Sequence, residues 1–185
     1  MKKYIAFLLT ILLLLTACTG NDPQENANQL IFNSVEVTSI LSITHPVDLT
    51  VHLSDEQLRA VFPGLDGDIS VNATYFDGAL RGLVGSLDDR IWFSLGTDRF
   101  FDWVDVSFDS APHQPSDVYG VEVMAFLVNQ VSHLSLQVDF SIGNIVYRIR
   151  AYDTSQTAQA HITEFVEHLI RTGPADLSVL EEITQ

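Results

Sequence analysis

The sequence predicts an α+β fold, in which a long C-terminal amphipathic helix covers one face of a mostly antiparallel sheet. Roughly seven short segments show the alternation or the β-branched content of strands, and turn residues separate most of them. One long segment near the C-terminus shows the period of an amphipathic helix, and a short helix is expected near residues 55–62. Such elements pack as a sheet layer and a helix layer. A β-sandwich is the alternative.

The first residues carry the features of an export signal. Lys2 and Lys3 precede an apolar run, Tyr4–Ala17, which matches the charged and apolar regions of such signals. As a helix the run would span about 21 Å at ~1.5 Å per residue, whereas a bilayer core is ~30 Å thick. We therefore expect this segment to be a cleaved signal and not a permanent transmembrane helix.

The tetrapeptide Leu15-Thr16-Ala17-Cys18 ends this run and resembles the lipobox of bacterial lipoprotein signals. In that family a diacylglyceryl group is attached to the cysteine thiol, and the chain is cleaved just before it, here between Ala17 and Cys18. The resemblance implies that residues 1–17 are a signal peptide and that Cys18 is the lipidated first residue of the mature protein. Two acyl chains suffice for stable anchoring, so an extracytoplasmic, lipid-anchored location is expected. The alternative is an ordinary secretory signal with a chance cysteine.

The composition excludes some classes of function. The chain has 9 Lys+Arg against 24 Asp+Glu, a net charge of −15, and both of its lysines lie in the predicted signal peptide. Phosphate binding requires a cationic surface, so no nucleic-acid partner is expected. Cys18 is the only cysteine, so no disulfide can form within the chain. The acidity serves solubility or attracts cations and basic partners.

Residues 18–29 are predicted to be the lipidated cysteine and a flexible tether, because they are polar and contain Asn, Asp, Pro, Gln and Gly. Residues 30–185 are predicted to form a single α+β domain. Its first strand is expected at residues 34–43, followed by a turn at His45-Pro46. Alternating apolar residues then predict a half-buried strand at residues 47–53.

A short helix follows this strand. Ser54 at the N-cap and Gln57 three residues later form the pattern of a capping box. Pro63-Gly64 cannot continue a helix, so the helix is expected to end at Phe62.

The middle of the domain shows one strand pattern after another. Asp77-Gly78 is a strong hairpin signal, and Asp88-Asp89 marks a further turn. Ala111–Ser116 contains two prolines and is expected to be a loop. Strands are predicted at residues 69–76, 79–84, 90–95, 103–108 and 118–128, the last of them long, apolar and central.

The clearest local prediction is a hairpin with Gly143-Asn144 as a two-residue loop. This loop sets the register, so that Phe140 faces Tyr147 and Asp139 faces Arg148. Apolar pairs then lie on one face of the sheet and the charged pair lies on the other, exposed face.

A long helix is expected to follow, capped by Asp153 or Thr154 and ending at Arg171 before Gly173 and Pro174. A short terminal helix is expected at residues 176–182. The long helix is predicted to bury an apolar stripe formed by Ala158, Ile162, Phe165, Val166, Leu169 and Ile170.

Four segments carry a further resemblance. They are Leu58–Leu65 (LRAVFPGL), Gly120–Val123 (GVEV), Tyr147–Asp153 (YRIRAYD) and Phe165–Leu180, which ends in GPADLSVL. They resemble parts of small uncharacterised lipoproteins of Gram-positive bacteria and cover under a quarter of the chain. The resemblance implies an exported lipoprotein and brings no known activity to carry over.

The histidines do not predict a metal site. His161 and His168 lie two turns, or about 10.5 Å, apart on the long helix, too far for both to bind one zinc ion at ~2 Å. His45, His52 and His113 have no fixed partner in the sequence, and a structural or solvated histidine is the preferred interpretation of each.

The carboxylates are weak candidates for chemistry. Asp66-Gly67-Asp68 resembles a fragment of a calcium loop but lacks the alternating ligands and the distant glutamate of an EF-hand. A second group is expected to lie on a solvated face: Asp98, Asp102, Asp105 and Asp109. The catalytic residues therefore stay unknown, and neither a metal nor a cofactor is predicted. No nucleophile-elbow serine or phosphate-binding glycine loop is present.

Two hypotheses for function follow. The first is a non-enzymatic domain, tethered through Cys18 to the membrane, that binds an envelope protein or a small ligand. The second is an envelope hydrolase whose site is built from scattered Asp, Glu and His residues. A pocket with converging titratable groups would favour the hydrolase, and a flat or grooved apolar patch would favour the binding domain.

Overall fold

A computed structural model describes residues 29–42, 47–97, 104–108, 112–130 and 133–180. The predicted signal peptide, Ala17, Cys18 and the tether up to residue 28 lie outside these ranges. So do the predicted turn at His45-Pro46 and residues Asp98, Asp102, Trp103 and Asp109. The predictions that concern them stay predictions.

The described residues form an α+β fold, as the sequence predicts. The strands are β1 (Phe32–Ser42), β2 (Leu49–His52), β3 (Ile69–Phe76), β4 (Ala79–Leu87), β5 (Ile91–Thr97), β6 (Val104–Phe108), β7 (Ser116–Val118), β8 (Val121–Gln130), β9 (His133–Ile142) and β10 (Ile145–Ala151). The helices are α2 (Asp55–Val61) and α3 (Gln156–Thr172). The strands pair in one sheet, so the sandwich alternative is not adopted.

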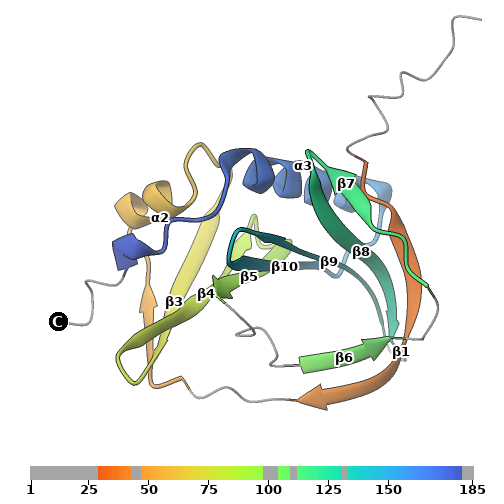
Figure 1. Cartoon of the computed structure of the whole chain (residues 1–185), viewed down its shortest axis with the longest axis horizontal. Helices are drawn as coiled ribbons and strands as arrows, with labels where there is room; N and C mark the ends of the chain where they lie inside the picture. Colours follow the sequence, from red (N-terminus) through yellow and green to blue (C-terminus); the bar gives the residue numbers. More distant parts are fainter. Residues whose placement is uncertain (1–28, 43–46, 98–103, 109–111, 131–132, 181–185) are drawn as a thin grey trace, which may run out of the picture.

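The sheet has the strand order β2-β3-β4-β5-β10-β9-β8-β1-β6, and β7 pairs with β8 beside this path. The pairing of β1 with β8 is parallel, and the other described pairings are antiparallel. The first half of β1 pairs with β8 and its second half pairs with β6. In Figure 1 the sheet bends strongly: α3 lies along one side of the molecule, and β6 lies on the opposite side.

The main core lies between the helices and one face of the sheet. Successive cross-strand partners continue this core across the sheet, from Phe140 through Tyr147 and Leu95 to Leu83, and all four are buried. Helix α3 joins it through Phe165, whose ring lies 5.4 Å from the ring of Phe93. A smaller cluster of Val35, Phe126 and Val128 lies on the other face. Both faces of the sheet are therefore partly covered.

A glycine in β4 makes room for this packing. A Cβ atom added to Gly85 would lie 2.6 Å from the backbone oxygen of Ser70 and 2.8 Å from the Cζ atom of Phe93. The Phe93 ring can lie across β4 because Gly85 has no side chain. That ring in turn contacts both Phe62 and Phe165.

Several local predictions are confirmed. Ser54 and Gln57 form the capping box with both hydrogen bonds present, and Phe62 is the C-cap of α2. The hairpin register places Phe140 opposite Tyr147 and Asp139 opposite Arg148. Gly173 ends α3 with a φ of 90°. These features depend on neighbouring residues, which is why the sequence alone predicts them.

Other local predictions are wrong. Tyr119 and Gly120 adopt φ values of 50° and 81° and make a turn, so the predicted strand 118–128 is divided between β7 and β8. The N-cap of α3 is Ser155, whose side chain accepts from Ala158 N–H, and neither Asp153 nor Thr154. Asp153 instead accepts hydrogen bonds from Ser155.

The lengths of some elements also differ from the prediction. Strand β4 continues to Leu87. Strand β2 lies at the edge of the sheet and is shorter than expected. Val47, which precedes it, and Leu49 are each 44% exposed. Within the predicted terminal helix 176–182, the structure shows a 3₁₀ turn at residues 178–180, and residues 181 and 182 lie outside the described ranges. No helix in the described ranges is long and apolar enough to cross a bilayer.

Candidate functional site

A pocket of about 350 Å³ lies beside helix α3. One wall is the part of α3 between His161 and His168. The others are the segment after α2, residues 64–66, and the turn between β4 and β5, residues 87–91. The lining residues are Gly64, Leu65, Asp66, Leu87, Asp88, Arg90, Ile91, His161, Glu164, Phe165 and His168. The volume falls at the small end of the range of about 300–1,000 Å³ for ligand pockets.

The segment after α2 enters the pocket because two glycines let it turn. Gly64 has a φ of 68°, and a Cβ atom there would lie 3.9 Å from Cε1 of His168. Gly67 has a φ of 121°, and a Cβ atom there would lie 2.7 Å from Cδ1 of Leu87. Both φ values strain residues with a side chain. The two glycines thus allow the segment to approach both α3 and β4.

Hydrogen bonds hold this segment to the turn between β4 and β5. The Asp88 carboxylate accepts a 2.8 Å hydrogen bond from the backbone N–H of Asp68, and Asp88 N–H donates to the Asp68 carbonyl at 2.8 Å. Asp88 and Asp89 adopt φ values of 53° and 51°, which Asp tolerates better than most residues. The predicted turn is confirmed, and it holds Asp88 at the pocket.

Helix α3 contributes one face of side chains to the pocket. His161, Glu164 and His168 lie at spacings of three and four residues, so they project from the same side of the helix. The sequence predicts ordinary histidines at both positions, whereas the fold places them beside Asp66 and Asp88, which are distant in the chain. In the described residues no three His, Cys, Asp or Glu side chains are grouped so that they could hold a metal ion.

The lining combines an apolar floor with a charged rim. The apolar residues are Leu65, Leu87, Ile91 and Phe165. The charged rim contains three carboxylates, from Asp66, Asp88 and Glu164, and one cation, Arg90. With neutral histidines the rim carries excess negative charge. The pocket therefore suits a ligand with a cationic group and a small apolar body.

The pocket lining contains acid–base groups from Asp66, Asp88, Glu164, His161 and His168. Its lining residues, all within the described ranges, include no hydroxyl, thiol or amine nucleophile. Two residues of the rim contact groups outside the pocket: Asp88 accepts a hydrogen bond from the Asp68 backbone, and Nε2 of His168 lies 3.5 Å from the Thr172 hydroxyl. A catalytic base is expected within hydrogen-bond reach of the group that it activates.

The other candidate residues from the sequence lie apart from this pocket. Nδ1 of His52 lies 3.3 Å from the Asn72 side-chain oxygen. The His113 ring packs edge-on against Phe126. Of the aspartates proposed for a solvated face, only the backbone of Asp105 lies in the described residues, in β6. Asp66 lines the pocket, so the Asp66-Gly67-Asp68 motif contributes a carboxylate to its rim.

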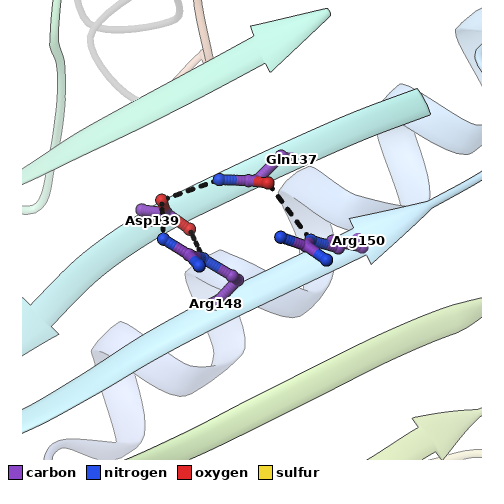
Figure 2. Close-up of polar contacts among 4 residues, drawn as sticks. All are labelled: Gln137, Asp139, Arg148 and Arg150. Carbon is purple, nitrogen blue, oxygen red and sulfur yellow. Dashed lines mark hydrogen bonds and ion pairs between the residues drawn. The ribbon is translucent and has the colours of Figure 1, made fainter. Parts of the chain in front are cut away.

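A second polar cluster lies on the sheet face opposite α3, and Figure 2 shows its four side chains. The Arg148 guanidinium donates to Asp139 through Nε at 2.9 Å and through Nη2 at 3.0 Å. This pair was expected to be exposed, but its side chains are 23% and 27% exposed. Gln137 and Arg150 are cross-strand partners two positions further along the same strands, so they join the same partly buried cluster. The alternation of β10 predicted the shared face, but not its burial.

Comparisons of this chain with protein-family models, with curated proteins and with solved structures found no match. The resemblance to Gram-positive lipoproteins therefore stays a prediction from the sequence. The features that bear on function are the pocket, the polar cluster and the chemistry of the N-terminal residues.

Proposed function

We propose that this chain is a membrane-anchored extracytoplasmic lipoprotein whose pocket beside α3 binds a small organic cation without transforming it. The support for the anchor is the Leu15-Thr16-Ala17-Cys18 sequence after a charged and apolar leader. The membrane is then a partner through the lipid on Cys18, and the pocket is available to a small ligand at the cell envelope.

The observation that carries the binding proposal is the charged rim above an apolar floor. An ammonium or guanidinium group would meet the carboxylates of Asp66, Asp88 and Glu164, while an attached ring or short alkyl chain would cover Leu65 and Phe165. Partly exposed charge pairs contribute little individually, roughly 0.2–1 kcal/mol. Binding therefore depends on several carboxylates acting together with the apolar contact.

An envelope hydrolase is the second candidate, because the pocket gathers the kinds of residue that it would use. Asp66, Asp88, Glu164, His161 and His168 come from distant parts of the chain and line one cavity. The lining residues of the pocket that the structure describes supply no hydroxyl or thiol nucleophile for these bases. We therefore favour binding over catalysis, and the same preparation can test both.

Benzylamine is a suitable probe, because it combines a cationic group with one ring, and benzyl alcohol is its neutral counterpart. The full lipidated chain in detergent micelles would be titrated with each compound and followed by ligand-observed nuclear magnetic resonance. We expect saturable binding of benzylamine and much weaker binding of benzyl alcohol. Equal signals from the two compounds would contradict a cation-selective pocket.

Two neighbouring aspartates provide a matched pair of variants. Asp88 lines the pocket and Asp89 does not, yet both adopt nearly the same backbone conformation. Asp88→Asn should raise the dissociation constant of benzylamine about two- to fivefold, as loss of a partly exposed charge pair implies. Asp89→Asn should leave it unchanged. Hydrolysis of p-nitrophenyl acetate that disappears in Glu164→Gln would favour the hydrolase instead.

A further inference from the structure

The polar cluster on the opposite face of the sheet ends in Arg150, for which the described residues provide a single hydrogen-bond acceptor. Figure 2 shows the chain of contacts across β9 and β10. Nε of Arg150 donates to the Gln137 side-chain oxygen at 3.1 Å, and Nε2 of Gln137 donates to Asp139 at 2.9 Å. Asp139 also accepts the two hydrogen bonds from Arg148. The Asp139 carboxylate thus binds the Arg148 guanidinium directly and is linked to the Arg150 guanidinium through Gln137.

Arg150 is oriented by Gln137 and lacks a direct anionic partner within the described residues. A guanidinium group has five N–H donors, and the single hydrogen bond of Arg150 uses the one on Nε. Its Nη donors have no acceptor in the part of the chain that the structure describes. Gln137 is only 5% exposed, so the residue that orients Arg150 is itself fixed by burial.

The surroundings of Arg150 disfavour an uncompensated charge. Burial and the nearby charge of Arg148 lower its pKa, while Asp139 and Tyr152 partly offset that effect. A partly buried charge without a direct counter-ion costs free energy, which an incoming anion can offset. The protein carries a net charge of −15, so the sign of this local positive charge is opposite to that of the net charge.

Two exposed aromatic rings lie beside Arg150. Trp92 is its cross-strand partner on β5, which places both side chains on the same face of the sheet. Trp92 is 42% exposed and Tyr152 is 60% exposed, and their ring centroids lie 5.3 Å apart in an edge-to-face arrangement. Exposed Trp and Tyr next to an arginine form the combination that is enriched at binding surfaces.

We propose that Arg150, Trp92 and Tyr152 form a binding site for a carboxylate that carries an aromatic or other planar apolar group. The two Nη atoms of a guanidinium match the spacing of carboxylate oxygens and can donate two parallel hydrogen bonds. The rings of Trp92 and Tyr152 provide an apolar surface for the attached group. The site lies on the sheet face opposite α3 and does not depend on the proposed function of the α3 pocket.

Benzoate is the probe that combines both properties. Benzamide has nearly the same shape without the charge, and acetate has the charge without the ring. The full lipidated chain in detergent micelles would be titrated with each compound, and with inorganic phosphate, by ligand-observed nuclear magnetic resonance. We expect benzoate to bind more tightly than either control compound. Equal binding of benzoate and benzamide, or tighter binding of inorganic phosphate, would overturn the carboxylate assignment.

Substitutions then locate the site. Arg150→Gln should weaken benzoate binding at least about tenfold, since a hydrogen bond to a charged group is lost. Arg59→Gln is the matched control, because Arg59 is an exposed arginine on α2. It should leave the affinity unchanged. Unchanged benzoate affinity in a folded Arg150→Gln chain would refute the proposal.

A substitution that is expected to increase the affinity for benzoate separates ligand binding from a merely structural role. Asp139→Asn removes the negative charge that lies near both arginines. Because Arg150 then has less compensation from within the protein, benzoate should bind severalfold more tightly. A structural role alone predicts no gain, and a weaker affinity would count against the proposal. Arg150→Lys keeps the charge in case Arg150→Gln fails to fold. It should retain part of the affinity, and full wild-type affinity would exclude recognition through paired Nη donors.

Discussion

The hydroxyl group of Tyr75 on β3 donates a 3.0 Å hydrogen bond to the backbone carbonyl of Leu180, 105 residues further along the chain. Both residues are buried, at 1% and 0% exposure. A second tyrosine acts nearby, because the Tyr147 hydroxyl accepts a 2.9 Å hydrogen bond from Ala175 N–H. Two tyrosines of the sheet therefore hold the segment that follows α3 against the main core.

Tyr75→Phe should destabilise the chain by about 1–3 kcal/mol, the cost of leaving a buried carbonyl without a donor. Chemical denaturation of wild type and variant would measure the difference. Tyr152→Phe is the control, since Tyr152 is 60% exposed, and it should change stability very little. Equal stability of Tyr75→Phe and wild type would mean that the Leu180 carbonyl finds another donor.

The two buried tyrosines also predict a dependence of stability on pH. Burial raises the pKa of Tyr75 and of Tyr147, and the Ala175 hydrogen bond only partly opposes this for Tyr147. Above about pH 10, the ordinary pKa of tyrosine, the unfolded chain loses these protons before the folded chain does. The free energy of unfolding should therefore be unaffected by these groups below about pH 10 and should fall as the pH rises further.

Denaturation curves from neutral pH to about pH 11 would measure this loss. Tyr147→Phe removes one of the two groups, so its stability should decline less steeply at alkaline pH than that of the wild type. A steeper decline in this variant would contradict the assignment.

The confirmed hairpin register predicts which substitutions are severe. Phe140 is 5% exposed and stacks on Tyr147 with ring centroids 4.9 Å apart, and Phe165 is 3% exposed. Phe140→Ala or Phe165→Ala should cost ~3–5 kcal/mol through lost burial and the cavity left behind. Arg148→Ala should cost less, because its partner Asp139 retains the Gln137 hydrogen bond and some exposure to water. A larger loss for Arg148→Ala in urea denaturation would reverse this ranking.

The domain is expected to fold without a metal ion. The described residues contain no grouping of three or more His, Cys, Asp or Glu side chains suited to a metal, and the only cysteine is the predicted lipidation site. A chelator should therefore leave the melting temperature nearly unchanged. A loss of several degrees that calcium restores would show that the aspartates bind a cation.

The predicted lipidation of Cys18 can be tested by metabolic labelling in cells. Labelled palmitate should be incorporated into the wild-type protein, because residues 15–18 resemble a lipobox. Cys18→Ala should abolish the label and release or mislocalise the chain. Thr19→Ala is the control for a change beside the cysteine and should remain labelled. Persistent labelling of Cys18→Ala would refute the anchor.

Several local features of this protein follow from the sequence alone. The capping box of Ser54 and Gln57, the turn at Asp77-Gly78 and the register across Gly143-Asn144 each depend on residues that are close in the chain. The apolar stripe of α3 follows from the helical period in the same way. The predicted lipidation of Cys18 also rests entirely on adjacent residues, and it concerns a part of the chain outside the described ranges.

The tertiary structure decided where distant residues meet. The parallel pairing of β1 with β8 and the turn at Tyr119-Gly120 inside an apolar stretch have no strong local signal. The α3 pocket joins Asp66, Asp88 and His161 only because the glycine-rich segment after α2 packs against both β4 and the helix. Periodicity determines which face a residue occupies, whereas the bending and packing of the sheet determine which face is buried and which charges become neighbours. For this reason the shared face of Arg148 and Arg150 was predictable, and the partly buried guanidinium beside Trp92 was not.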